Sequence, residues 1–180
     1  MAGFGFIRKL IWTFSLISLG YPKDYSYRFN NEYARGISGN TSYLKLNYFT
    51  FDKYNRTMKA ANVEFDFLGE TVDKNNNAID VIFHFSIFKS NQYRKTPIAF
   101  PAKLCDILGT EQFDIPNITK NSTLRNCPVR KGHHYMYNVM LTSNGWPKSL
   151  PAGRFLLDVK FMYKNVMIIQ IEWFLEIITL

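Results

Sequence analysis

The chain has 180 residues, of which 47% are apolar, 17% aromatic and only 20% charged. This composition supplies a core for one domain, or at most two small ones, and excludes a disordered segment. The 16 Phe and 11 Tyr favour strands, so we expect an all-β or β-rich fold. The 22 basic and 14 acidic residues leave a net charge of +8, which by itself fits nucleic acid, an anionic surface or simple solubility.

The first twenty residues have the pattern of a secretory signal peptide. Arg8 and Lys9 precede an apolar run at residues 10–19, and the small residues Ser18 and Gly20 occupy the positions that signal peptidase reads. The run is too short to span a membrane, which takes about 20 apolar residues. We therefore predict a signal peptide at residues 1–20 and a secreted, extracellular domain at residues 21–180. Its basic residues are dispersed, which argues against a nucleic-acid partner.

Alternation of apolar and polar residues marks the first strands of this domain. Residues 61–68 alternate Val63, Phe65 and Phe67 with polar side chains, and a second apolar row occupies residues 79–87. The polar stretch at residues 73–77 indicates a turn, so we expect these two strands to form a long hairpin. Earlier strands are predicted at residues 25–29 and 43–51, with a loop at residues 36–39.

Residues 97–128 break the pattern, because they contain four prolines, both cysteines and a short helical stretch at residues 102–108. We expect a covering loop. Strands resume at residues 133–141, where Tyr135 and Tyr137 are assigned to the inner row, and continue at 155–163 and 169–177 around a turn at 164–165. The C-terminal strand is too short and too polar for a membrane span. Six or seven strands predict an antiparallel immunoglobulin-like β-sandwich with a short helix in the covering loop.

Cys105 and Cys127 are the two cysteines, and an even number in an exported chain favours one disulfide. Closing this loop of 22 residues should stabilise the fold by about 3 kcal/mol. Four Asn-x-Ser/Thr sequons are candidate N-glycosylation sites. They lie at Asn40, Asn55, Asn117 and Asn121.

The sequence contains no motif of a known catalytic or phosphate-binding site. A nucleophile elbow, a Gly-rich phosphate loop and a His-Glu-x-x-His metal motif are all absent. His133 and His134 are adjacent, so on a strand they point to opposite faces and are poorly placed to chelate one metal ion. We predict no catalytic residue, no metal and no cofactor. A hydrolase with an unrecognised site is the least favoured alternative.

Large aromatic residues concentrate on the predicted inner rows. Such rings could either fill the roughly 10 Å between two packed sheets or hold the sheets apart around an apolar pocket, and composition alone leaves both readings open. The candidate pocket residues are Phe65, Phe67, Phe83, Phe85, Tyr135, Tyr137, Phe161 and Trp173.

A series of short motifs is distributed over most of residues 21–180. From the N-terminal side they are Asn55-Arg56-Thr57, Lys89-Ser90-Asn91-Gln92-Tyr93, Leu104-Cys105-Asp106, Asn126-Cys127-Pro128, Lys131-Gly132 leading into Tyr135, Asn144-Gly145-Trp146-Pro147 and Leu150-Pro151-Ala152-Gly153. Their order, their spacing and their position behind a signal peptide make the combination specific. It resembles the insect chemosensory protein B (CheB) family.

That family is similar to the ganglioside-activator and wider lipid-recognition (ML-like) β-sandwich proteins, which hold a lipid between splayed sheets. The resemblance implies an apolar pocket and a role in presenting hydrophobic cues, such as cuticular-hydrocarbon pheromones, to sensory neurons. The implied partners are a hydrophobic small molecule or lipid and a sensory-neuron membrane receptor or channel. One departure is that lipid-recognition relatives commonly carry several disulfides, whereas Cys105 and Cys127 allow one here.

Two functional hypotheses therefore remain. The first is a secreted, non-enzymatic binding protein for a hydrophobic ligand, acting in gustatory or pheromone perception. The alternative is a secreted adhesion or receptor-binding β-sandwich with a dry core, which would act through its loops and an edge strand.

Overall fold

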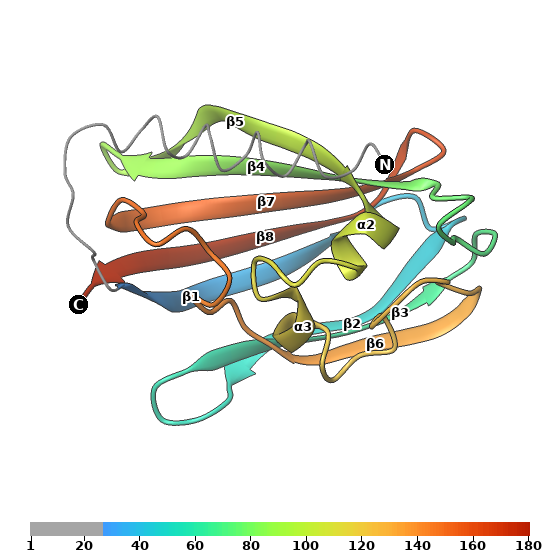
Figure 1. Ribbon diagram of the computed structural model, residues 1–180, viewed down its shortest axis with the longest axis horizontal. Coiled ribbons are helices and arrows are strands. Elements are labelled where there is room, and N and C mark those ends of the chain that lie inside the picture. Colours follow the sequence, from blue (N-terminus) through green and yellow to red (C-terminus); the bar gives the residue numbers. More distant parts are fainter. Residues whose placement is uncertain (1–26) are drawn as a thin grey trace.

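The computed structural model describes residues 27–180 as two antiparallel sheets that face each other (Figure 1). The predicted signal peptide and the start of the first predicted strand lie outside the described residues. The five-stranded sheet has the order β1 (Tyr27–Ser38), β8 (Val166–Thr179), β7 (Gly153–Tyr163), β4 (Ile79–Lys89) and β5 (Gln92–Lys103). The three-stranded sheet has the order β2 (Leu44–Lys53), β3 (Lys59–Phe67) and β6 (Gly132–Val139). The predicted β-sandwich is confirmed.

Two short helices lie in the segment between β5 and β6. They are α2 (Leu104–Leu108), which contacts β5, and α3 (Ile115–Ile118), which contacts β6 (Figure 1). The helix predicted at residues 102–108 is therefore present. Its first two predicted residues instead end strand β5, where Ala102 pairs with Val81.

The alternating patterns place one face of each strand in the core. On β3, Val63, Phe65 and Phe67 are buried, whereas the intervening polar side chains are partly exposed. On β8, the buried residues Trp173, Leu175 and Ile177 alternate in the same way. Burial of these apolar side chains contributes about 25 cal/mol per Å² removed from water, and it drives the two sheets together.

The hairpin expected between residues 61–68 and 79–87 does not form. Strand β3 pairs with β2 and β6, whereas β4 pairs with β5 and β7 in the other sheet. Residues 68–78 cross between the sheets, and Val72 forms a bridge with Val129 on the way. The chain does bend at residues 74–76, as the polar stretch 73–77 predicted. A bend, however, does not determine whether the strands before and after it pair with each other.

Residues 97–103 belong to β5 and not to a covering loop. Pro97 and Pro101 are compatible with a strand because β5 lies at the edge of its sheet, where one side of the backbone has no ladder partner. Pro97 also lies in the register shift opposite His84 and Ser86. Residues 36–38, predicted as a loop, extend β1 along β8. The described chain therefore has eight strands, more than the six or seven predicted.

The two sheets are closed differently along their two sides. On one side β1 runs against β2, and a Cβ atom at Gly36 would lie only 2.8 Å from the ring of Phe49. Glycine at this position lets the strands approach closely. The other side is open in the sense that the edge strands β5 and β6 are not paired with each other, and the segment that carries α2 and α3 runs across it (Figure 1). A residue of that segment, Leu104, joins the buried core.

Candidate functional site

The structure places six of the eight candidate pocket residues between the sheets. Phe83 and Phe85 project from β4, Phe65 and Phe67 from β3, Phe161 from β7 and Trp173 from β8. They belong to two core clusters. The first includes Phe65 and Phe67, and the second includes Trp173. Phe83 packs against both clusters, so it lies where they meet.

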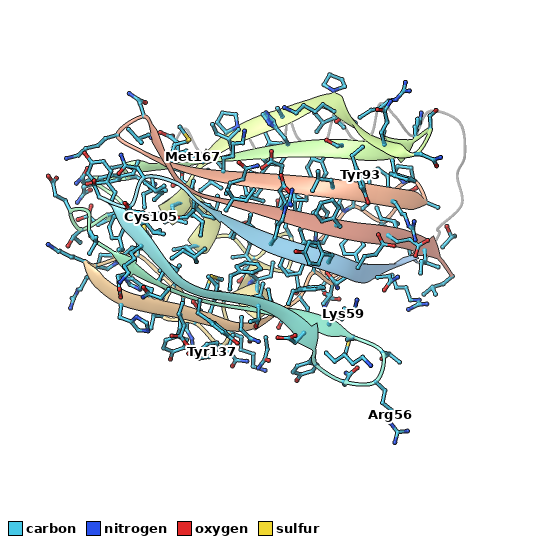
Figure 2. The ribbon with its side chains drawn as sticks, turned by 180° about the vertical axis from the view of Figure 1, so that it is seen from behind. Arg56, Lys59, Tyr93, Cys105, Tyr137 and Met167 are labelled. Atoms are coloured by element: carbon cyan, nitrogen blue, oxygen red, sulfur yellow. A yellow bond between two sulfur atoms is a disulfide. The ribbon has the colours of Figure 1, made fainter. Side chains whose placement is uncertain are left out.

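The assignment of Tyr135 and Tyr137 to the inner row was wrong. Tyr135 pairs with Glu64 on the outer face of β3, and the Tyr137 hydroxyl donates to Glu64 Oε1 at 2.5 Å. Figure 2 shows Tyr137 on the side of β6 that faces away from the other sheet. The inner positions of β6 are occupied by His134 and Met136. Both faces of this strand carry large side chains, so its alternation does not say which face is buried.

His134 is a polar residue of the interior that the sequence assigned to the wrong face. Only 8% of its surface is exposed, and its ring stacks on Phe65 at 5.5 Å. Nε2 lies 2.7 Å from the carbonyl oxygen of Arg130 and must donate to it, and Nδ1 lies 3.0 Å from the hydroxyl of Thr123. Both ring nitrogens therefore have a hydrogen-bond partner. His134 thereby joins β6 to the segment that covers the open side.

Burial is uneven along the inner face of the large sheet. At one end Val81 and Tyr163 are each 1% exposed, as is Phe67 opposite them. Further along, Phe83 and Phe85 keep part of their surface accessible although they also point inward, and Phe161, the cross-strand partner of Val81, is partly accessible as well. The ring of Phe100 on β5 stacks on Phe83 at 4.9 Å and is itself only partly buried. The interior therefore combines a close-packed end with a group of aromatic rings that is less completely covered.

This group of rings has the surface chemistry of an apolar binding site. Phe85 lies 6.2 Å from Phe100, so three rings from β4 and β5 are in contact along one inner surface. Aromatic faces and edges offer large apolar contact area without a charged group. Such a surface can bind hydrocarbon chains or rings. It provides no nucleophile.

The outer face of the small sheet carries a polar network in place of an apolar surface. Asp66 accepts from Asn47 Nδ2 at 2.9 Å and lies 3.1 Å from His133 Nδ1. The hydrogen bond from Asn47, followed by that from His133, lowers the pKa of the Asp66 carboxyl below its ordinary value. The hydrogen bond to Glu64 raises the pKa of Tyr137. These groups hold one another in place on an exposed surface.

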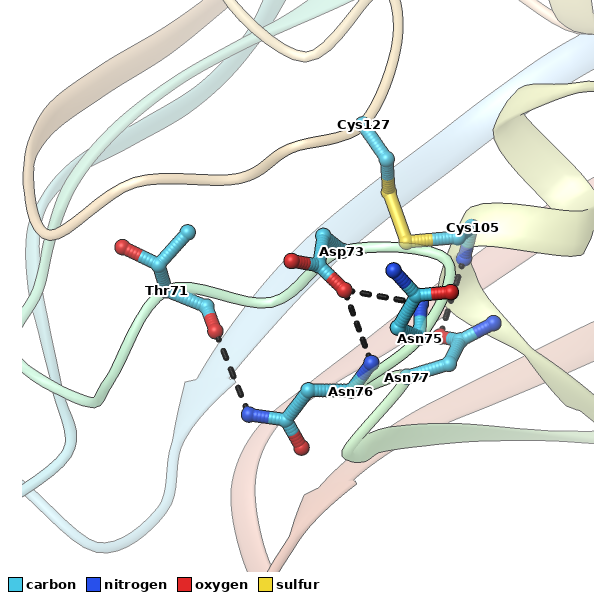
Figure 3. Close-up of a disulfide and its surroundings, with 7 residues drawn as sticks. All are labelled: Thr71, Asp73, Asn75, Asn76, Asn77, Cys105 and Cys127. Atoms are coloured by element: carbon cyan, nitrogen blue, oxygen red, sulfur yellow. Dashed lines mark hydrogen bonds between the residues drawn. A yellow bond between two sulfur atoms is a disulfide. The ribbon is translucent and has the colours of Figure 1, made fainter.

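The predicted disulfide between Cys105 and Cys127 is present, with the two Cα atoms 5.6 Å apart (Figure 3). Cys105 is buried at the start of α2, and its amide donates to Asn77 Oδ1 at 3.2 Å. In the same loop, Asp73 Oδ1 accepts from the amides of Asn75 and Asn76 at 2.7 Å each. The bridge thus ties the covering segment to itself beside the crossover between the two sheets.

The four sequon asparagines differ in their surroundings. Asn55, Asn117 and Asn121 are exposed, and Asn40 is partly buried. The amide of Asn117 is engaged, because it donates through Nδ2 to the buried carboxylate of Asp114 at 2.5 Å. Glycan attachment at any of the four stays a prediction. The exposed amides offer the most space for it.

Within residues 27–180, none of the helices has the length and hydropathy of a membrane span. In the same part of the chain, no group of three or more His, Cys, Asp or Glu side chains is arranged to hold a metal ion.

Fold and interior together define an antiparallel, immunoglobulin-like β-sandwich with aromatic side chains between its sheets. Residues 83–157 match a family described as "Protein of unknown function (DUF1091)". The match runs from β4 into β7 and includes both cysteines. Among solved structures, the crystal structure of a Niemann-Pick type C2 protein from Japanese carpenter ant aligns with 80% of this chain and 96% of its own, at 12% identity and a TM-score of 0.32. No curated protein sequence gives a significant match.

Proposed function

We propose that this protein is a secreted, non-enzymatic carrier that holds a hydrophobic ligand between its two sheets. The observation that carries the proposal is the incomplete burial of Phe83, Phe85 and Phe161, which point inward from the middle of the large sheet. Protein interiors are normally close-packed, and the neighbouring Val81 and Tyr163 meet that standard. Apolar rings that stay partly accessible gain free energy when a ligand covers them.

The expected affinity follows from the area that a ligand would cover. Burying about 400 Å² of apolar surface gives on the order of 10 kcal/mol before association costs are subtracted. Lost translational and rotational freedom takes back at least about 4 kcal/mol of this gain. The remainder is at most about 6 kcal/mol, which corresponds to a dissociation constant of about 40 μM or weaker for a long-chain compound.

The biological setting that we propose is chemosensory. The motifs around Cys105, Cys127 and Trp146 resemble the insect chemosensory protein B family, and the pattern of residues 1–20 supports secretion. A disulfide is typical of proteins that fold in an oxidising compartment. In this setting the carrier presents cues of the cuticular-hydrocarbon type to a receptor or channel on a sensory neuron.

The carrier proposal is tested by ligand binding to protein secreted from insect cells. Native mass spectrometry should detect co-purified lipid, and the delipidated protein should bind an environment-sensitive apolar fluorophore that long-chain hydrocarbons displace. Phe83→Trp adds volume to the inner surface and should weaken binding at least about tenfold. Tyr48→Ala removes a 46% exposed ring from the outer face of the small sheet and serves as the control.

The carrier proposal also has a result that would overturn it. A delipidated wild-type protein that binds no apolar probe up to the solubility limit, together with a Phe83→Trp variant that is simply less stable, would contradict the carrier proposal. The protein would then be better described as a secreted adhesion or receptor-binding sandwich with a dry core.

A further inference from the structure

The hairpin that joins β2 to β3 carries an ordered tip that projects beyond the two sheets. Figure 2 shows Arg56 at the far end of this projection, with Lys59 near its base. The amides of Tyr54 and Asn55 donate to the carbonyl oxygen of Met58 at 2.9 and 3.2 Å. Asn55 Oδ1 accepts from the amides of Thr57 and Met58 at 2.9 Å each. These hydrogen bonds fix the loop, so its side chains are presented in a defined arrangement.

Two large apolar side chains of the tip are exposed. Tyr54 is 52% accessible and Met58 is 43% accessible. Single exposed apolar residues are common on protein surfaces and need no explanation. Here, however, the two side chains flank one short loop at the outermost point of the fold, where no other part of the described chain covers them.

The tip is also basic. Lys53, Arg56 and Lys59 are exposed and outnumber Asp52, the acidic residue within residues 52–59 of the hairpin. The Lys59 ammonium donates to the carbonyl oxygen of Glu32 at 3.0 Å and lies 5.9 Å from the centre of the Phe51 ring. Lys59 is therefore anchored at the base of the hairpin, while Arg56 marks its end.

We propose that this tip, residues 53–59, docks the protein on the surface of an anionic phospholipid bilayer. Basic side chains are attracted to anionic head groups, and Tyr and Met can enter the interfacial region with little loss of hydrogen bonding. A sulfated polysaccharide would match the charges but would leave Tyr54 and Met58 unused. The combination favours a bilayer. The docking is independent of whether the sheets enclose a ligand.

The experiment is co-sedimentation with vesicles of phosphatidylcholine containing about 20% phosphatidylserine, beside vesicles of phosphatidylcholine alone. Wild-type protein should prefer the anionic vesicles, and the preference should fall when salt rises from about 0.1 to 0.5 M because the Debye length shortens. Arg56→Glu should weaken binding about tenfold or more. The double variant Tyr54→Ser/Met58→Ser should weaken it comparably while leaving the salt dependence in place.

The matched control is Lys74→Glu. Lys74 is exposed in the crossover beyond the opposite end of β3, and the substitution changes the net charge by the same amount as Arg56→Glu. We expect it to change vesicle binding by less than about twofold, since its charge lies more than a Debye length from the tip. Circular dichroism and thermal unfolding of each variant establish that the fold is retained.

Three outcomes would overturn the proposal. One is the absence of wild-type binding to anionic vesicles at low salt. A second is an equal loss of binding in Arg56→Glu and Lys74→Glu, which would show only a dependence on net charge. The third concerns the sequon at Asn55. If the vesicle-bound protein from insect cells carries a glycan there, the tip cannot reach the bilayer as proposed. If the first outcome is found and heparin binds the wild type and the Tyr54→Ser/Met58→Ser variant equally, the tip is a polyanion site instead.

Discussion

The indole Nε1 of Trp173 donates to Asn31 Oδ1 at 2.7 Å, across 142 positions of sequence. The same Asn31 side chain donates from Nδ2 to the carbonyl oxygen of Leu141 at 3.0 Å and accepts from the Leu141 amide at 3.3 Å. One side chain on β1 therefore binds a core residue of β8 and the backbone just beyond β6. It supplies hydrogen-bond partners for the Trp173 N–H and the Leu141 peptide groups, which the surrounding apolar side chains cannot provide.

Replacing Asn31 with Ala should destabilise the fold by about 3 kcal/mol, because the substitution leaves the buried Trp173 N–H and the Leu141 peptide without partners. Urea denaturation measures the change. Asn30→Ala is the control on the same strand and should cost less than about 1 kcal/mol, since within residues 27–180 its side-chain amide donates to Glu176 alone, at 3.2 Å. Similar losses of stability in both variants would show that the three hydrogen bonds of Asn31 contribute no more to the free energy of unfolding than the one of Asn30.

Phe67→Ala and Phe83→Ala compare a close-packed site with a partly open one. Phe67 is 1% exposed, so its truncation should cost about 3–5 kcal/mol from lost burial and a new cavity. Phe83 is only partly buried, so under the carrier proposal its truncation enlarges space that a ligand would occupy, and we expect about 1–2 kcal/mol in the delipidated protein. Chemical denaturation of both variants gives the comparison. A loss at Phe83 as large as that at Phe67 would indicate a filled interior.

The disulfide should contribute through the unfolded state. Removing it in the double variant Cys105→Ala/Cys127→Ala frees a loop of 22 residues and should lower the free energy of unfolding by about 3 kcal/mol. Denaturation of the reduced wild type should give a similar value. Native protein that reacts at both cysteines with iodoacetamide, without prior reduction, would be incompatible with the bridge.

Asp66 should titrate below its ordinary pKa of 3.8. Because the folded pKa is lowered, the ionised carboxylate favours the folded state above pH 3.8, and this contribution disappears as the pH falls through the folded value. Nuclear magnetic resonance of the side-chain carboxyl carbon follows the titration. Asn47→Ala and His133→Ala should each move the pKa back toward 3.8, since the hydrogen bond from Asn47 is the largest single cause of the lowered pKa and that from His133 is the next. An unchanged pKa in either variant would contradict this assignment.

Much of the fold follows from patterns that any single strand displays. The alternation at Val63, Phe65 and Phe67 identified the buried face of β3, and the two cysteines identified the bridge over the open side. On β6 the same reasoning failed. Its inner position is taken by His134, which is buried only because Thr123 and Arg130 supply hydrogen-bond partners from the covering segment. No pattern within residues 132–139 reveals partners that come from elsewhere in the chain.

By itself, the sequence determined that this chain forms a β-sandwich with one disulfide and which face of most strands is apolar, because those properties depend on residue type and a period of two. Only the tertiary structure decided which strands share a sheet. Residues 61–68 and 79–87 are neighbours in sequence, yet β3 and β4 lie in opposite sheets. Pairing depends on hydrogen bonds between distant segments, as Asn31 and Trp173 illustrate. The same long-range packing determines that the Phe83 side chain is only partly buried and that Arg56 lies at the end of a projecting hairpin.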